Sequence, residues 1–206
     1  MTITKLTLGY AAVNCYILKY SENKAVIIDP GDEGEEIAAE LTRQRLTPDK
    51  IFLTHGHFDH MGAAAFLKEK YGVPVYINEK DSVMLNNREK SGGLIAPFIP
   101  FNPVTADGFL KEGDIIKLGE YSLRVMETPG HSEGSICFIG DDFIVTGDTV
   151  FSGSVGRTDL YSGNGGKLMQ SVKRLAKMEK NYRLYCGHGG DTDLETEKRF
   201  NPFFDM

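Results

Sequence analysis

Four side chains able to bind a metal ion lie within six positions of this sequence, in the segment THGHFDH at residues 54–60. Imidazole is the commonest metal ligand in proteins, and carboxylates bind many of the same ions. The glycine between the first two histidines lets the backbone turn, so that His55 and His57 face one ion while Asp59 and His60 face a neighbouring one. The segment therefore predicts a two-metal site. Incidental histidines on a surface loop explain it less well, because an apolar strand precedes it and an alanine-rich helix follows.

The two remaining histidines and one aspartate also follow predicted strands. His131 lies in Thr-Pro-Gly-His-Ser, Asp148 closes the apolar run Val-Thr-Gly-Asp, and His188 lies in Cys-Gly-His-Gly-Gly. Each residue alone has a structural interpretation, as a turn histidine or as the cap of the next turn. Together with residues 54–60 they indicate one site, because active sites gather where strands end in loops.

A further aspartate, Asp29, closes the third predicted strand before Pro30 and Gly31. Histidines that bind metals usually donate their second ring N–H to an acceptor, and this carboxylate is a candidate for that role. An aspartate that only shapes the turn explains the position equally well.

Alternating and helical patterns place these residues on a frame of short strands and four helices. Strands are predicted at Thr2–Leu8, Val13–Lys19, Ala25–Ile28, Asp49–Leu53, Val73–Ile77, Ile115–Leu118, Tyr121–Glu127, Ser135–Ile139, Phe143–Thr146 and Arg183–Tyr185. Helices are predicted at Glu33–Arg45, at Met61–Tyr71 just after His60, at Asn164–Lys180 with Asn164 as cap, and at Leu194–Phe200. Two similar halves without a linker indicate one α+β domain over 1–206, with two sheets face to face and helices outside.

The stretch from 86 to 108 lacks periodicity and mixes glycines and prolines with Phe98 and Phe101. A loop of this length is usually functional, for example an active-site lid, although a simple surface excursion is nearly as good an explanation.

Composition excludes some classes of function. Acidic residues outnumber basic ones by 29 to 23, which gives no overall support for binding nucleic acid. No apolar run is long enough to span a membrane, and the N-terminus does not resemble a signal peptide. The three cysteines, Cys15, Cys137 and Cys186, form no CxxC pair and fit reduced thiols in a cytoplasmic protein.

The spacing HxHxDH at 55–60, with His131, Asp148 and His188 downstream, resembles the metallo-β-lactamase superfamily over nearly the whole chain. The resemblance implies an αββα sandwich of two mixed sheets, with the site in a shallow groove at one edge. It also implies the ligand sets. These are His55, His57 and His131 on the first metal, Asp59, His60 and His188 on the second, and Asp148 bridging, with Asp59 and Asp148 counted as catalytic.

Within the superfamily, the motifs TPGH, GDT, GSVGRTD and the final GHG with NPFF are similar to the short bacterial hydroxyacylglutathione hydrolase (glyoxalase II) type. That type lacks a C-terminal helical domain, and this chain also ends soon after His188. Arg157 falls where longer relatives carry a basic residue that binds a glutathione carboxylate. An arginine that is paired with Asp159 for structural reasons is an equally good interpretation.

The resemblance implies a hydrolase in which a metal-bridging hydroxide attacks a small thioester such as an S-2-hydroxyacylglutathione. The expected cofactors are two divalent ions, with Zn²⁺ favoured and Fe or Mn as alternatives. The second hypothesis is a persulfide dioxygenase that holds one iron through His57 or His55, His131 and Asp148. Lactone or β-lactam hydrolysis on the same fold is a third.

Overall fold

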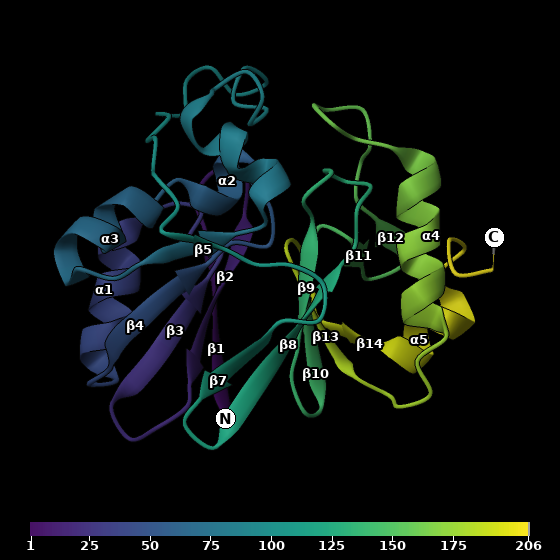
Figure 1. Ribbon diagram of the computed structural model, residues 1–206, viewed down its shortest axis with the longest axis horizontal. Coiled ribbons are helices and arrows are strands. Elements are labelled where there is room, and N and C mark those ends of the chain that lie inside the picture. The colour runs from purple at the N-terminus through teal and green to yellow at the C-terminus, as the bar shows by residue number, and fades with distance from the viewer. Residues whose placement is uncertain (206) are drawn as a thin grey trace.

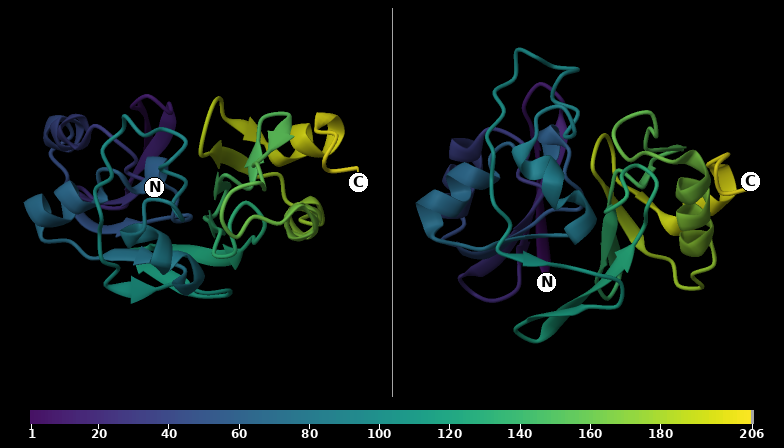
Figure 2. Two further views of the ribbon diagram at one scale, coloured as in Figure 1. Left: turned by 90° about the horizontal axis from the view of Figure 1, so that it is seen from above. Right: turned by 45° about the horizontal axis from the view of Figure 1, so that its top comes forward.

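The structure, a computed structural model, describes residues 1–205 and consists of two six-stranded sheets packed face to face with helices on both outer sides (Figure 1). Figure 2 shows the same layers from above, with the N-terminal and C-terminal halves side by side. The predicted α+β sandwich is confirmed. No helix within the described residues is long and apolar enough to cross a membrane.

The first sheet runs in chain order from β1 to β6. Its strands are β1 (Thr2–Leu8), β2 (Val13–Lys19), β3 (Lys24–Ile28), β4 (Thr47–Phe52), β5 (Val75–Ile77) and β6 (Gly108–Phe109). Strands β1, β2 and β3 pair antiparallel, and β3 to β6 pair parallel. Helices α1 (Gly34–Arg43) and α3 (Ala64–Tyr71) cover its outer face, and their apolar residues share one buried cluster with this sheet.

The second sheet has the order β14-β13-β10-β9-β8-β7. Its strands are β7 (Ile115–Leu118), β8 (Tyr121–Glu127), β9 (Ile136–Ile139), β10 (Phe143–Gly147), β13 (Arg183–Cys186) and β14 (Thr192–Asp193). Helices α4 (Gly165–Ala176) and α5 (Leu194–Phe200) cover its outer face, and β11 (Val150–Phe151) and β12 (Ser154–Val155) form a separate ribbon.

The inner faces of the sheets meet in a second apolar cluster that includes Phe52 and Phe138, whose ring centroids are 5.5 Å apart. Strand β2 is buried from Val13 to Leu18, because one face meets this cluster and the other meets the helices. Near the start of β2, the Asn14 backbone N–H donates to the carbonyl of Gly187 at 2.7 Å. This bond ties the two halves together beside His188.

One helix boundary differs from the prediction in a way that affects the site. A short helix, α2 (Phe58–Met61), already contains His60, whereas the sequence pattern predicts one helix that begins after it. The helix is interrupted because the N–H of Ala63 donates to the carbonyl of Pro30 at 2.9 Å instead of continuing the helical ladder. The break lets α2 turn two potential ligands toward the sheets.

Other differences concern short elements. The 3₁₀ helix η1 (Glu79–Asn86) was not predicted, and neither were β6, β11, β12 and β14, each of two residues. Two residues are too few to show a period. Helix α4 ends at Ala176, before the predicted Lys180.

Candidate metal centre

Strands from both sheets end at one edge of the sandwich, and the potential ligands lie in the loops that follow. Asp29 follows β3, residues 54–60 follow β4, His131 follows β8, Asp148 follows β10 and His188 follows β13. The structure brings all of these residues together at the upper edge of both sheets in Figure 1.

The first group of potential ligands is His55, His57 and His131, whose nitrogens lie within 4.8 Å of one another. Nδ1 of His57 is 2.8 Å from Nε2 of His131. All three side chains are buried. Three inward-facing imidazoles are a typical set for one divalent ion.

The second group is Asp59, His60 and His188, whose potential ligand atoms also lie within 4.8 Å of one another. Nε2 of His188 is 3.3 Å from Nε2 of His60 and 3.3 Å from Oδ2 of Asp59. The side chain of His188 is 27% exposed, so this group borders solvent.

Asp148 lies between the two groups. Its Oδ1 is 3.3 Å from Nε2 of His60, and its Oδ2 is 3.4 Å from Nε2 of His131. One carboxylate thus faces one member of each group, which is the arrangement that a bridging ligand requires.

Backbone carbonyls fix the orientation of two of the imidazoles. His131 donates its Nδ1–H to the carbonyl of Arg157 at 2.8 Å, and His188 donates its Nδ1–H to the carbonyl of Ala11 at 3.1 Å. Because a carbonyl only accepts, the proton of each neutral ring is held on Nδ1 and Nε2 keeps its lone pair for an ion. The sequence carries no signal for either contact, since any residue supplies a carbonyl.

Asp29 and Thr54 orient two more rings. Asp29 accepts from the N–H and the hydroxyl of Thr54, both at 2.7 Å, and its Oδ2 is 3.0 Å from Nδ1 of His60. The Thr54 hydroxyl oxygen is in turn 3.0 Å from Nδ1 of His55. One buried carboxylate therefore supports a ligand from each group, and its left-handed backbone (φ 51°) also forms the turn before Pro30.

The electrostatics of the site reflect close packing of imidazoles around one carboxylate. Burial and the nearby His131 lower the pKa of His57 to about 3. Burial opposes the charged form of His60, yet Asp148 and Asp29 raise its pKa well above the usual value. Burial likewise opposes ionisation of Asp148, but the charge of His60 holds its pKa far below normal.

The donor set fits divalent metal ions. Among the described residues, the buried side-chain polar atoms without a hydrogen-bond partner are Nε2 of His55, Nε2 of His57 and Oδ1 of Asp148. Buried polar groups are almost always satisfied, so three such atoms in one cluster fit a site for a cation. Gly187 leaves room for the Asp148 carboxylate, because a Cβ at that position would lie 2.1 Å from Oδ1 of Asp148.

Asp81, on η1, is a buried residue of the site that sequence reasoning missed. Its carboxylate accepts from the N–H of Gly56 at 3.1 Å, from the Ser132 hydroxyl at 2.5 Å and from the N–H of Gly134 at 2.8 Å. It thus joins the loop of His55 and His57 to the loop of His131. Burial raises its pKa, and these hydrogen bonds only partly offset that effect. No sequence pattern pointed to Asp81, because η1 itself was not predicted.

A groove of about 560 Å³ lies over the ligands and is lined by residues from both halves of the chain. Arg157 lines it, and its guanidinium donates two hydrogen bonds of 2.7 Å to Asp159. Both interpretations of this arginine therefore have a structural basis, since it is paired and also faces the groove.

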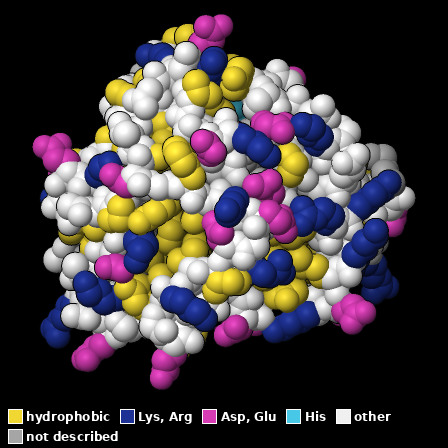
Figure 3. All heavy atoms as spheres, viewed as in Figure 1, with side chains coloured by type: hydrophobic (Ala, Val, Ile, Leu, Met, Phe, Trp, Pro, Cys, Tyr) yellow, Lys and Arg dark blue, Asp and Glu magenta, His cyan; other side chains and the backbone are white. Residues whose placement is uncertain are grey.

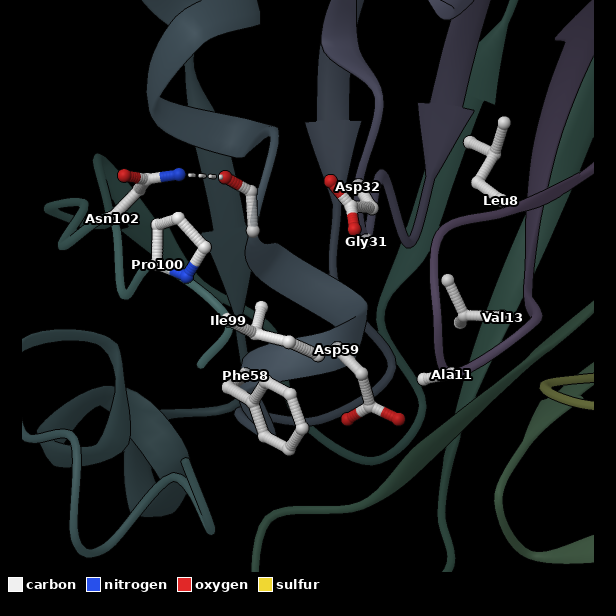
Figure 4. Close-up of a pocket in the computed structure, with 11 residues that line it drawn as sticks. Leu8, Ala11, Val13, Gly31, Asp32, Phe58, Asp59, Ile99, Pro100 and Asn102 are labelled. Carbon is white, nitrogen blue, oxygen red and sulfur yellow. Dashed lines mark hydrogen bonds between the residues drawn. The ribbon is translucent and has the colours of Figure 1, made fainter. Parts of the chain in front are cut away.

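The segment 86–108 forms one wall of the groove. Ile95, Ala96 and Ile99 line it, and Asn102 donates to the carbonyl of Gly62 at 3.0 Å. Figure 4 shows that bond, and shows Ile99 close to Phe58 and Asp59 around a smaller cavity of about 60 Å³. The segment is therefore part of the site rather than a surface excursion.

Comparison with known proteins agrees with this geometry. Residues 8–188 match the Metallo-beta-lactamase superfamily. The probable metallo-hydrolase YqgX of Bacillus subtilis is 35% identical, with 97% of this chain and 95% of that protein covered. The hydroxyacylglutathione hydrolase GloC of Haemophilus influenzae is 36% identical, with 92% of each covered.

Two solved structures have the same fold over nearly the whole chain. BLEG-1, a B3 metallo-β-lactamase, has a TM-score of 0.94 at 32% identity, and all of both chains is covered. TTHA1623 in a di-iron-bound form has a TM-score of 0.86 at 36% identity, with 97% of this chain and 99% of that chain covered.

Proposed function

Because the chain belongs to the metallo-β-lactamase superfamily and is a metal-dependent hydrolase of that group, we propose that it cleaves a small thioester such as an S-2-hydroxyacylglutathione. The observation that carries the proposal is the pair of ligand groups on either side of Asp148 at the base of one groove. The similarity to GloC supports glutathione as the thiol.

We assign His55, His57 and His131 to one ion, Asp59, His60 and His188 to the other, and Asp148 to both. Zinc suits these imidazole and carboxylate donors, and so do iron and manganese. Two such ions, when bound, lower the pKa of a shared water and polarise a carbonyl oxygen.

The protein's own side chains hold this centre in place. Asp29 and Thr54 fix two rings, and the carbonyls of Arg157 and Ala11 fix two others. Such supporting contacts contribute about 10- to 100-fold in metal affinity or activity. The preset orientation means that little reorganisation is needed during the reaction.

A cysteine nucleophile is a poor alternative. All three thiols are buried and free, and burial raises the pKa of Cys137 to about 11 and that of Cys186 to about 12. A thiol with so high a pKa holds almost no thiolate at neutral pH. Free thiols also fit a reducing compartment, so a cytoplasmic location is part of the proposal.

Arg157 is the proposed contact for a carboxylate of the thiol half of the substrate, since it lines the groove with a planar guanidinium. The one-iron dioxygenase hypothesis fits less well, because it leaves Asp59, His60 and His188 without a role. β-Lactam hydrolysis is a second candidate, supported by the similarity to BLEG-1.

The test is hydrolysis of S-D-lactoylglutathione by protein stripped of metal and reloaded with zinc, iron or manganese. We expect no turnover without metal and restored turnover with two ions per chain. A penicillin and a cephalosporin in parallel assays address the second candidate. Failure of every loaded form to cleave the thioester would exclude the proposed reaction.

A further inference from the structure

Exposed apolar side chains are concentrated on one wall of the groove. Tyr10 and Ile95 line it with 79% and 57% of their surface exposed, and Ile99 continues the wall toward Asp59. Phe98, 65% exposed, does not itself line the groove but packs edge-to-face on the lining residue Tyr10, with ring centroids 4.9 Å apart. We call Tyr10, Ile95, Phe98 and Ile99 the apolar wall. Figure 3 shows hydrophobic side chains bordering a visible histidine near the top of the molecule, where segment 86–108 lies.

Large apolar side chains exposed together usually mark a binding surface. A site for a fully polar substrate gains nothing from them, because such groups contribute by being removed from water. The apolar wall comes from two segments far apart in the sequence, the turn after β1 and residues 95–99, and both face the same ligands. This placement indicates that it contacts substrate.

The two sides of the groove differ in charge. Among the described residues, Arg157 is the only lysine or arginine that lines the groove, and it lies on the C-terminal side together with Ser154 and the apolar residues Phe151, Val155 and Leu160. The N-terminal side carries no charged lining residue apart from the ligand Asp59. A thioester with one charged half and one apolar half therefore fits in one orientation, with the charged thiol toward Arg157 and the acyl group toward the apolar wall.

Hydrogen bonds from one arginine hold this wall in shape. Arg88 donates to the carbonyls of Gly93, Pro97 and Ile99, at 3.3, 2.7 and 2.9 Å. The backbone that carries Ile95 and Phe98 is thus fixed from beneath, so little conformational entropy is lost when a ligand covers these side chains.

Resting on the proposed thioesterase function, we infer that the apolar wall binds the side chain of the acyl group and gives the enzyme a preference for aryl or long alkyl acyl thioesters. The preference arises because a larger acyl side chain removes more apolar surface from water, on both itself and the wall. A methyl group, as in the lactoyl thioester, covers little of the wall.

The test compares S-D-lactoylglutathione with S-D-mandeloylglutathione, which share the hydroxyl and the thiol and differ in methyl against phenyl. We expect kcat/KM to be about tenfold higher for the phenyl compound. Tyr10→Ala and Phe98→Ala should each reduce that ratio by about threefold or more. Phe200→Ala is the matched control, because Phe200 is 68% exposed on α5 and does not line the groove.

A ratio near or below one, or a ratio that Tyr10→Ala and Phe98→Ala leave unchanged, overturns the inference while the thioesterase function stands. If neither thioester is cleaved, the proposed function fails. The inference about the apolar wall is then tested by the affinity of the protein for two S-alkylglutathiones. By calorimetry on the metal-loaded protein, S-hexylglutathione should bind about tenfold more tightly than S-methylglutathione, and Phe98→Ala should remove the difference. Equal binding of the two thioethers overturns it.

Discussion

The ligand loops and the apolar wall border the same groove but are built in opposite ways. In the ligand loops, the histidines are buried or nearly so. Hydrogen bonds to hydroxyl, carboxylate or carbonyl oxygens hold four of the five rings. In the apolar wall, Tyr10 and Phe98 are largely exposed, and their rings pack edge-to-face on each other. Under the proposed function, the difference means that the metal centre is preset, whereas substrate choice depends on exposed side chains that can change at little cost to the fold.

Among changes in the ligand loops, Asp148→Ala should have the largest effect on metal binding and turnover. Both ligand groups then lose their shared carboxylate, and the positive charge of His60 loses its main partner. We expect loss of bound metal and a fall in turnover of about a thousandfold or more. Asp142→Ala, at an exposed position just before β10, is the control. Retention of both ions with full turnover would sink the bridging assignment.

A smaller perturbation of the same region is Asp81→Asn, which keeps the shape of the side chain. An amide nitrogen must then face one of the donors on Gly56, Ser132 or Gly134. The loops should shift, and metal affinity should fall about 10- to 100-fold, as measured by competition with a chelator. Unchanged metal affinity in a variant whose metal-free form is destabilised would show that Asp81 supports the fold only.

Arg157 shares features of both regions, because it lines the groove and is also held in an ion pair with Asp159. Asp159→Asn removes the negative charge beside the guanidinium and one of its two hydrogen bonds, and should lower KM for a glutathione thioester about threefold, while Arg157→Ala should raise KM by a similar factor. Both effects should appear in KM with kcat nearly constant. Equal losses of stability in both variants without a change in KM would favour the purely structural interpretation.

The pH dependence of metal binding tests the ligand loops without mutation. Asp148 and Asp29 raise the pKa of His60 despite burial, and Asp59 and Asp148 do so for His188, so the metal-free protein retains protons there. An ion must displace them, so its affinity should rise as pH increases from 6.5, with proton release measurable by calorimetry in two buffers.

The same two pKa shifts also determine the stability of the metal-free form. Their contribution is fully present below pH 6.5 and is lost as pH rises through the raised pKa values. Metal affinity that does not vary with pH, together with a melting temperature that does not fall over this range, would contradict the proton-loaded state of His60 and His188.

The cluster of potential ligands could be predicted because metal chemistry restricts residue type and because loops after strands carry such residues. His55, His131 and His188 are recognisable in the sequence for that reason. The sandwich followed from strand patterns such as Tyr121–Glu127, where alternation marks one inner face. The family resemblance supplied the proposed ligand pairing and the proposed bridging role of Asp148, which spacing alone left open.

The remaining features depend on contacts that leave no local pattern. The helix break at Ala63 arises from a bond to Pro30, which lies 33 positions earlier in the sequence. Asp81 meets its partners only after η1 docks between two loops. The apolar wall pairs Tyr10 with Phe98 across 88 positions, and no pattern in either segment predicts contact with the other.

Metal content and reactivity measured on one preparation test the central claim most directly. Protein purified without chelator should contain two divalent ions per chain and should hydrolyse S-D-lactoylglutathione without consuming oxygen. One iron per chain, together with oxygen uptake on a glutathione persulfide and no thioester hydrolysis, would contradict the account.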